Sequence, residues 1–374
     1  MRASLTALGR LLRGAATLAL RLLLVVVLLE GVASWIGFGI AVPEGGMPPE
    51  RERLHMRYDP ELGWAHIPDT RLENFYGQGR HLTINHQGFR GKRVYSPQTP
   101  EGRLRAICAG DQFTLGVGVG DADTWCARLE TFEPRLETVN LGQGGYGLDQ
   151  SYLWYRRDGT AFETDLLVFA FVRDDFGRME SDHYRRYAKP LLRLGGDGGL
   201  EVRNVPVPRH GERVPWLVRH APLFEQLRIV QLARPALDAL FPARAEKLTV
   251  GELAELAGSV FEALQRASDE QGATLVLLYL PTRADYDAPG DLWRRRIARE
   301  ARRRGIAFVD LVDEQRSLSR REMSDLYVPA FAGDARGEPE PFSELGNAWV
   351  AESLWSHLRR LPELAALLDA RAPS

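Results

Sequence analysis

The sequence has few cysteines and lacks the basic blocks that nucleic-acid-binding proteins carry. Cys108 and Cys126 are the two cysteines of the 374 residues, and neither has the Cys/His spacing of a metal site. Cys108 stands in an apolar strand pattern, for which a free, buried thiol is the expected state. The net charge is −2, and basic residues cluster only near the N-terminus and within 291–305. We therefore expect no metal, no cofactor and no nucleic-acid partner.

A long apolar run is present near the N-terminus. Residues 14–42 are mostly apolar, which exceeds the ~20 residues that a helix needs to cross a bilayer. Three arginines precede the run, so the positive-inside rule places residues 1–13 in the cytoplasm. We expect one uncleaved transmembrane helix in a bacterial inner membrane, with everything after it on the periplasmic side. A cleaved signal peptide, ending near 32–34, is the alternative.

Glu30 lies inside this apolar run. An ionised carboxylate at membrane depth is costly, and such residues usually face a protein partner or a polar cavity. Glu30 is therefore a candidate contact with another membrane subunit. The alternative places it at the outer interface of a tilted helix.

After a linker and β-rich lead-in at 43–100, the chain alternates between strand and helix patterns. Such repeated units predict an α/β fold, a three-layer αβα sandwich with a mostly parallel sheet of flavodoxin-like type, over 101–370. Residues 177–247 interrupt the alternation as an insertion, with a hairpin at 189–208 and a helical stretch around 222–240. Expected strands are 103–110, 136–142, 165–172, 274–281 and 306–311; expected helices are 123–132, 148–159, one after the Thr249/Glu252 capping box, 291–305 and 345–361.

Four blocks of the sequence resemble those of the SGNH (GDSL-type) hydrolases, in a membrane-anchored form. They are "AGDQFTLGVGVGDADTW", "VNLGQGGYGLDQ", "DLLVFAFVRDD" and "PFSELGNAWVAESL". The resemblance covers nearly the whole chain and implies an acyl hydrolase that uses a serine, a histidine and an aspartate. It also implies an oxyanion hole made by the serine and glycine N–H groups and an asparagine amide.

The residues at the family's catalytic positions are replaced almost throughout. Gln112, after Asp111, stands at the serine position, Asp174 at the asparagine position, and Glu338 and Pro341 at the aspartate and histidine positions; Gly142 is kept. A carboxamide nitrogen is not a nucleophile, because its lone pair is delocalised. Proline has no side-chain base, and an ionised aspartate would repel an oxyanion. The sequence predicts no catalytic residue.

Two other interpretations of this region stay open. The carboxylates of Asp111, Asp174, Asp175 and Glu338 would bind a divalent cation if they converged, although structural hydrogen bonding of Asp111 and Asp175 is favoured. A rebuilt hydrolase would need another hydroxyl and base, for which Thr114, Ser343, His357 and the upstream His66, His81 and His86 are weak candidates.

The function that these observations favour is a membrane-anchored pseudoenzyme. It would act as a binding or accessory subunit of a membrane or cell-envelope complex, with the lipid bilayer and other subunits as partners, and with a glycan or acyl chain as a possible ligand. The alternative is an acyl esterase or O-acyltransferase that acts on cell-surface polysaccharide. Fold alone does not decide between them.

Overall fold

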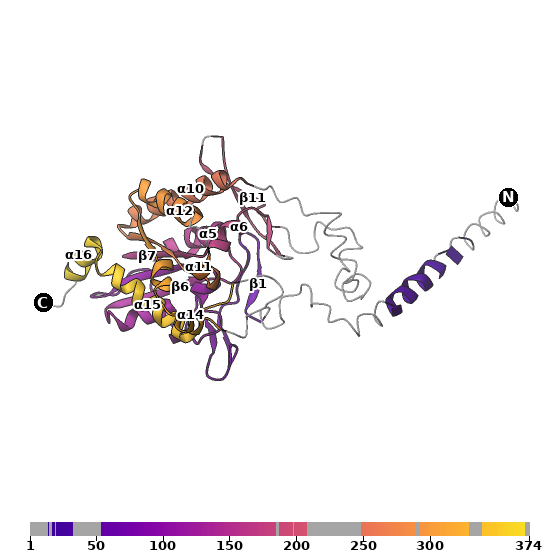
Figure 1. Ribbon diagram of the computed structural model, residues 1–374, viewed down its shortest axis with the longest axis horizontal. Coiled ribbons are helices and arrows are strands. Elements are labelled where there is room, and N and C mark those ends of the chain that lie inside the picture. Colours follow the sequence, from indigo (N-terminus) through magenta and orange to yellow (C-terminus); the bar gives the residue numbers. More distant parts are fainter. Residues whose placement is uncertain are drawn as a thin grey trace. The chain divides into compact units, whose positions relative to one another are not determined.

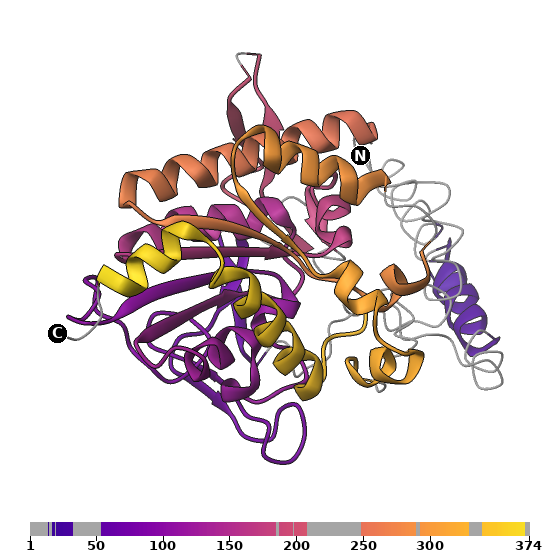
Figure 2. The ribbon, with the colours of Figure 1, turned by 60° about the vertical axis from the view of Figure 1, so that its left-hand side comes forward.

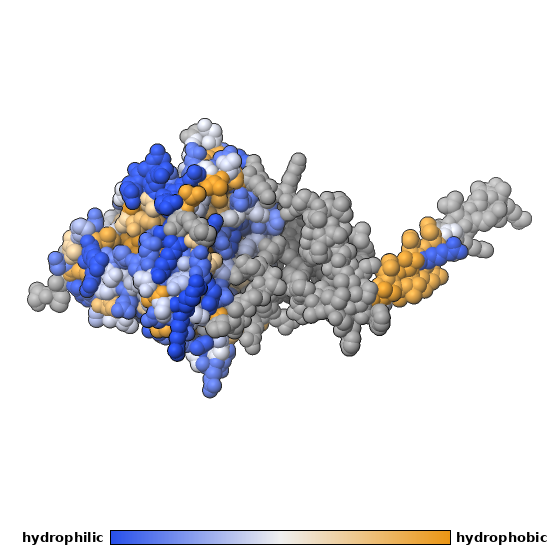
Figure 3. Space-filling view, in the orientation of Figure 1, coloured by the Kyte–Doolittle hydropathy of each residue, from blue (hydrophilic) through white to orange (hydrophobic). Residues whose placement is uncertain are grey.

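A computed structural model describes residues 14, 17–18, 20–32, 54–184, 187–196, 198–207, 248–288, 292–328 and 339–370. The chain divides into two compact units, residues 1–47 with 211–244 and residues 48–210 with 245–374. In the first unit, residues 20–32 form a helix, and the face of this helix that Figure 3 shows is mostly apolar. Arg21 and Glu30 are its charged residues. None of the helices in the described part of the chain combines the length and the apolar character needed to cross a membrane. Glu30 lies on this helix and is half-buried.

The second unit is built on a five-stranded sheet with strand order β13-β12-β7-β5-β6 (Figure 1). Every neighbouring pair in it is parallel, so the expected α/β class and the five expected strands are confirmed. The strands are β5 (Leu104–Gly110), β6 (Leu136–Gly142), β7 (Leu166–Phe171), β12 (Thr274–Tyr279) and β13 (Ala307–Asp310).

Apolar residues cover both faces of the sheet, because alternate side chains of each strand point to opposite faces. On one face, Ile107, Phe169 and Leu277 pack with the helices α5 (Leu148–Asp158), α10 (Val250–Gln271) and α12 (Leu292–Arg303). On the other, Cys108, Val168 and Val276 pack with α4 (Trp125–Arg128) and α15 (Glu344–Leu358). The rotated view in Figure 2 separates the two helical layers.

Most of the expected helices and the hairpin form where the sequence patterns place them. The Thr249/Glu252 capping box opens α10, and the hairpin at the start of the insertion pairs β10 (Leu191–Leu194) with β11 (Leu200–Arg203). The helical stretch expected at 222–240 lies outside the described residues. The helix expected over 123–132 forms in part: α4 and η2 (Leu129–Thr131) follow one another over 125–131, and Asp123 belongs to a separate turn, η1 (Asp121–Asp123). Thr124, which is extended, separates η1 from α4, whereas Leu129 keeps helical backbone angles.

The remaining elements frame the sheet. They are β1 (Met56–Asp59), β2 (Gly63–His66), β3 (Thr70–Leu72), β4 (Leu82–Ile84), α3 (Gln112–Leu115), η3 (Gly159–Ala161), α6 (Arg173–Arg178), β8 (His183–Tyr184), β9 (Tyr187–Ala188), α11 (Arg283–Asp287), α13 (Val312–Arg316), α14 (Arg320–Asp325) and α16 (Pro362–Ala370). The pairs β1-β2, β3-β4 and β8-β9 are antiparallel.

The outer edge of β6 is covered by residues of the lead-in and of η2. The Thr138 N–H donates to Oε1 of Glu130 at 2.8 Å, and the Tyr95 hydroxyl donates to the Thr138 carbonyl at 2.7 Å. The Arg90 N–H donates to the Asn140 carbonyl at 3.1 Å. The lead-in thus belongs to the α/β unit, since it satisfies backbone groups of its edge strand.

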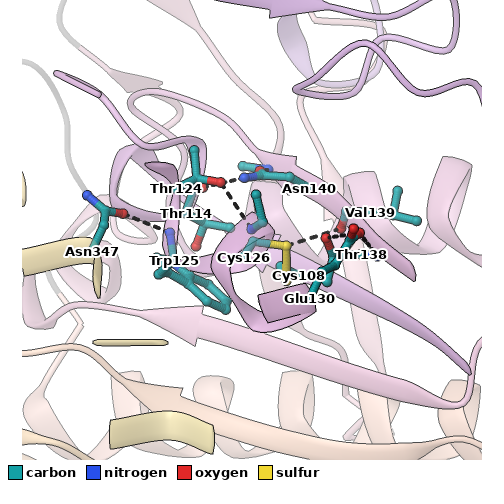
Figure 4. Close-up of a disulfide and its surroundings, with 12 residues drawn as sticks. Cys108, Thr114, Thr124, Trp125, Cys126, Glu130, Thr138, Val139, Asn140 and Asn347 are labelled. Atoms are coloured by element: carbon teal, nitrogen blue, oxygen red, sulfur yellow. Dashed lines mark hydrogen bonds between the residues drawn. A yellow bond between two sulfur atoms is a disulfide. The ribbon is translucent and has the colours of Figure 1, made fainter. Parts of the chain in front are cut away.

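The two cysteines form a disulfide, so the expectation of a free Cys108 thiol is wrong. Cys108 and Cys126 are bonded, with their Cα atoms 6.1 Å apart. Cys108 lies in β5 and Cys126 in α4, on the same face of the sheet (Figure 4). The turn at Thr124, whose hydroxyl accepts the Ala127 N–H at 3.2 Å, directs Cys126 toward the strand. Sequence spacing gave no sign of this, because the pairing depends on how α4 docks on the sheet.

Candidate functional site

The candidate site lies at the carboxyl ends of β5, β6 and β7. The chain passes from β5 to β6 on one side of β5 and then returns to β7 on the other side. This reversal is a topological switch point, where open α/β sheets usually bind ligands. The loops after these three strands carry Asp111 and Gln112, Gly142, and Asp174 and Asp175.

Asp111 and Gln112 form the sharp turn between β5 and α3. Asp111 is the N-cap of α3, and its Oδ1 accepts the Phe113 N–H at 2.9 Å. This is the ordinary role of an aspartate before a helix. Gln112 is 9% exposed, and its Oε1 accepts hydrogen bonds from the Gly145 N–H and from Nη1 of Arg178, both at 3.3 Å. The carboxamide at the family's serine position is therefore held by two donors.

Gly142 ends β6 where α3 approaches the strand very closely. A Cβ at this position would lie 2.0 Å from the Leu115 nitrogen, so the position excludes any side chain. The Gly142 N–H donates to Oδ1 of Asn140 at 2.9 Å. Its carbonyl oxygen lies 3.1 Å from Nε2 of His66, which donates in the tautomer that carries hydrogen on that nitrogen.

Asp174 and Asp175 are neighbours on α6 but have opposite environments. Asp174 is exposed, whereas Asp175 is buried. Oδ2 of Asp175 accepts the Val172 N–H at 2.9 Å, and its Oδ1 accepts from Nη1 of Arg178 at 2.6 Å. Burial, followed by the nearby charge of Asp111, raises the pKa of Asp175 well above its ordinary value, against the attraction of Arg178.

Arg178 is the residue of the candidate site that the sequence analysis missed. Its Nη1 contacts Gln112 and Asp175, lies 3.5 Å from Oδ2 of Asp111, and donates to the Tyr146 carbonyl at 2.8 Å. The guanidinium is buried and lies over the Tyr184 ring, 5.3 Å from its centroid. The Asp175/Arg178 spacing of i, i+3 on a helix was the available signal. The cluster of Asp111, Gln112, Asp175 and Arg178 is called the arginine cluster below.

Pro341 lies near the same end of the sheet, because the next residue, Phe342, packs against α3. Phe342 packs edge-on against Phe113 of α3, with ring centroids 5.0 Å apart. Pro341 itself is buried, and its carbonyl oxygen accepts the Val328 N–H at 3.0 Å. Glu338 lies outside the described residues. Within those residues, no group of three or more His, Cys, Asp or Glu side chains has the geometry of a metal site.

A histidine and a hydroxyl do contact each other beside the arginine cluster. Oγ of Ser181 lies 2.9 Å from Nδ1 of His183, and Oδ1 of Asp182 lies 2.9 Å from the same nitrogen. In a catalytic triad the serine and the acid contact different ring nitrogens. Oγ of Ser181 also accepts the His183 N–H at 3.2 Å, as in a local serine turn. The other weak candidates have structural partners: the side chain of Ser343 caps α15, and His357 contacts Glu314.

Comparisons with known proteins add structural likeness at low identity. No family model matches the chain, and no curated protein matches it. Among solved structures, a lipolytic protein of the G-D-S-L family from Desulfitobacterium hafniense is 13% identical, with a TM-score of 0.36, over 68% of this chain and 100% of its own. The lipase/acylhydrolase from Enterococcus faecalis is 9% identical, with a TM-score of 0.39, over 68% and 95%. A G-D-S-L family protein from Veillonella parvula is 13% identical, with a TM-score of 0.34, over 69% and 100%. Likeness at this level carries no argument about activity.

Proposed function

We propose that the chain is an SGNH-like pseudoenzyme that serves as a binding or accessory subunit of a cell-envelope complex. The observation that carries the proposal is the state of residue 112. Gln112 has no nucleophilic atom, and its carboxamide is tied to the Gly145 N–H and to Arg178. The Gly142 N–H, an oxyanion donor in the family that the sequence resembles, is bonded to Asn140. Among the described residues, the position that corresponds to the family's serine therefore offers no nucleophile, and the Gly142 N–H is already used by Asn140.

An ester-hydrolysis assay tests the loss of activity. The full chain is incubated with p-nitrophenyl acetate and with acetylated xylan, beside Gln112→Ala and the heat-denatured protein. We expect all three to release product at the same rate, since no side chain at 112 takes part in bond breaking. Turnover by the native chain that Gln112→Ala removes would overturn the proposal.

A second candidate function is ester hydrolysis by another serine. The contact between Ser181 and His183 favours it, although the acid shares the nitrogen that the serine contacts. Ser181→Ala in the same assay separates the two functions. Activity that is lost in Ser181→Ala and kept in Gln112→Ala would establish an esterase with a relocated site.

The location that we propose is the periplasmic face of a bacterial inner membrane, with residues 14–42 as the anchor and residues 1–13 in the cytoplasm. The apolar run after three arginines supports the anchor, and the Cys108–Cys126 disulfide supports an oxidising compartment. Protease treatment of spheroplasts tests the topology through a C-terminal epitope tag. Loss of the tag from intact spheroplasts is expected, and protection of the tag would contradict this orientation.

The accessory role is tested at Glu30. A carboxylate within a membrane-spanning segment would be retained to meet a polar group on a partner subunit. Chemical cross-linking in membranes, followed by purification of the wild type and Glu30→Leu, should give one defined adduct that the variant loses. Leu29→Ala is the matched control on the same segment. A chain that stays monomeric in both preparations would contradict the accessory role.

A further inference from the structure

Helix α12 presents an arginine-rich face to solvent. Its twelve residues, LWRRRIAREARR, contain six arginines and one glutamate, although the whole chain has a net charge of −2. Ile297 and Ala301 are its buried residues and pack into the core. At 3.6 residues per turn, the side chains of Arg295, Arg296, Arg299 and Arg302 lie on the opposite side, and all four are exposed. These four residues are called the α12 arginine face.

Three acidic side chains near α12 are bound to arginines outside this face. Oε2 of Glu300 pairs with Arg304 at 2.7 Å, and Oε1 pairs with Arg303 at 3.4 Å. Asp310 and Asp313 hold Arg294. Within the described part of the chain, no ion pair involves a residue of the α12 arginine face. None of its four guanidinium groups is therefore held in an ion pair by a carboxylate of the described residues.

The shape of this surface distinguishes between anionic partners. Leu292, at the start of α12, is 77% exposed, so an apolar side chain stands at one end of the arginine face. Trp293 is turned inward, where it packs edge-on against Phe176 with centroids 4.8 Å apart. A sugar chain is usually bound in a groove with a stacking aromatic ring, whereas this face is one side of a convex helix. A cationic helix face with an adjoining apolar residue suits a lipid surface.

We propose that α12 docks on anionic phospholipid headgroups, with the guanidinium groups of its arginine face against phosphates and Leu292 in the interface. Guanidinium groups match the geometry of phosphate oxygens and pair with them bidentately. Each basic residue at an anionic surface strengthens binding roughly fivefold. The docking fixes the orientation of the α/β domain at a membrane and goes beyond the proposed accessory role.

The test follows residue 292 in the full chain. Because both native cysteines form the disulfide, Leu292→Cys provides one thiol for an environment-sensitive fluorophore. The labelled chain is reconstituted into phosphatidylcholine vesicles, with and without phosphatidylglycerol. We expect a blue shift of the emission that requires phosphatidylglycerol and disappears at high salt, because salt screens the headgroup charge.

Charge-reversal variants decide whether the arginines cause the shift. Arg295→Glu/Arg299→Glu should lower the docked fraction by tenfold or more. Arg359→Glu/Arg360→Glu, which changes two exposed arginines just after α15, should leave it unchanged. An equal shift in both lipid mixtures, an equal effect of the two double variants, or no shift for a folded chain would each overturn the proposal. Polygalacturonate that binds the arginine face while vesicles do not would identify an acidic polymer instead.

Anchoring is measured separately in the same preparation. Flotation of the chain at high salt with vesicles of phosphatidylcholine alone measures membrane insertion of residues 14–42. The fluorophore at residue 292 measures docking of α12. Failure of the anchor and failure of the docking therefore give different results.

Discussion

Arg178 donates a hydrogen bond to the carboxamide oxygen of Gln112 over 3.3 Å, with the Asp175 carboxylate 2.6 Å from the same nitrogen. One buried cation thus satisfies groups from the loops after β5 and β7. A serine at residue 112 would be too short to make the contact that the carboxamide makes. Gln112 and Arg178 therefore form one structural unit.

Removal of Arg178 should strongly destabilise the fold. In Arg178→Met the buried Asp111 and Asp175 would face each other without a cation, and such a loss typically costs about 3–5 kcal/mol. The free energy of unfolding from urea titration measures the effect. Arg320→Met, which removes an exposed arginine paired with Asp287, is the control and should change nothing measurable. Equal stability of Arg178→Met and wild type would contradict this prediction.

The buried pair His55 and His66 should make stability fall in acid. Burial lowers the pKa of His55 to about 3 and that of His66 to about 4, from an ordinary value of 6.5. Below 6.5 the unfolded chain binds protons that the folded chain does not, so stability is full above that pH and is lost as pH falls toward 4. The loss is about 1.4 kcal/mol per unit of pKa difference for each histidine. Urea titrations between pH 7 and 4 give the free energy of unfolding at each pH. We expect this free energy to fall less steeply with decreasing pH in His55→Gln than in the wild type. Asp310 acts in the opposite sense, because burial raises its pKa to about 6, and the difference between variant and wild type removes its contribution.

Replacement by alanine should lower the stability of the fold at Gly142 and should not lower it at the nearby Gly144. Gly142→Ala places a Cβ 2.0 Å from the Leu115 nitrogen, whereas Gly144→Ala meets nothing within 4 Å. Overpacking of this kind costs about 1–3 kcal/mol, and contact with backbone puts the cost at the upper end. Gly144→Ala should be neutral or slightly stabilising. Thermal unfolding of both variants checks the prediction, and equal midpoints would mean that α3 moves away from β6 without cost.

The disulfide should be present in the purified protein and should stabilise it. Alkylation of the denatured chain is expected to label no cysteine before reduction and both afterwards. Closing a loop of 18 residues stabilises a protein by about 3 kcal/mol in the chain-entropy description. Cys108→Ala/Cys126→Ala should lose about that much in urea titration. Full labelling without reductant would contradict both the pairing and the oxidising compartment.

The sequence predicted the sheet well because its signals are local. The apolar runs of β5, β7 and β12, and the Thr249 capping box, each depend on residues near one another in the chain. The helix expected over 123–132 begins two residues later than predicted, because Thr124 is extended and caps α4. The Cys108–Cys126 bond was not predicted, because it depends on how α4 docks on the sheet.

The sequence predicted which residues lie at the strand ends of the candidate site. It did not predict which side chains these residues contact. Strand ends and the family resemblance brought Asp111, Gln112, Gly142 and Asp174 to one edge of the sheet. Asp174 is exposed and Asp175 is buried because of the direction in which α6 runs. No sequence motif indicates this direction. The contact of Arg178 with Gln112 spans 66 residues, so local spacing indicated only its pairing with Asp175.

The covered edge of β6 limits how this molecule meets others. Glu130, Tyr95 and Arg90 already occupy backbone groups that an added strand would need along Thr138 and Asn140. A second copy, or an extended peptide, therefore cannot lengthen the sheet from that side without first displacing the lead-in. Association at that side has to use side-chain surfaces and therefore depends on the sequence of the partner. The covering also prevents open-ended strand pairing between copies at this edge.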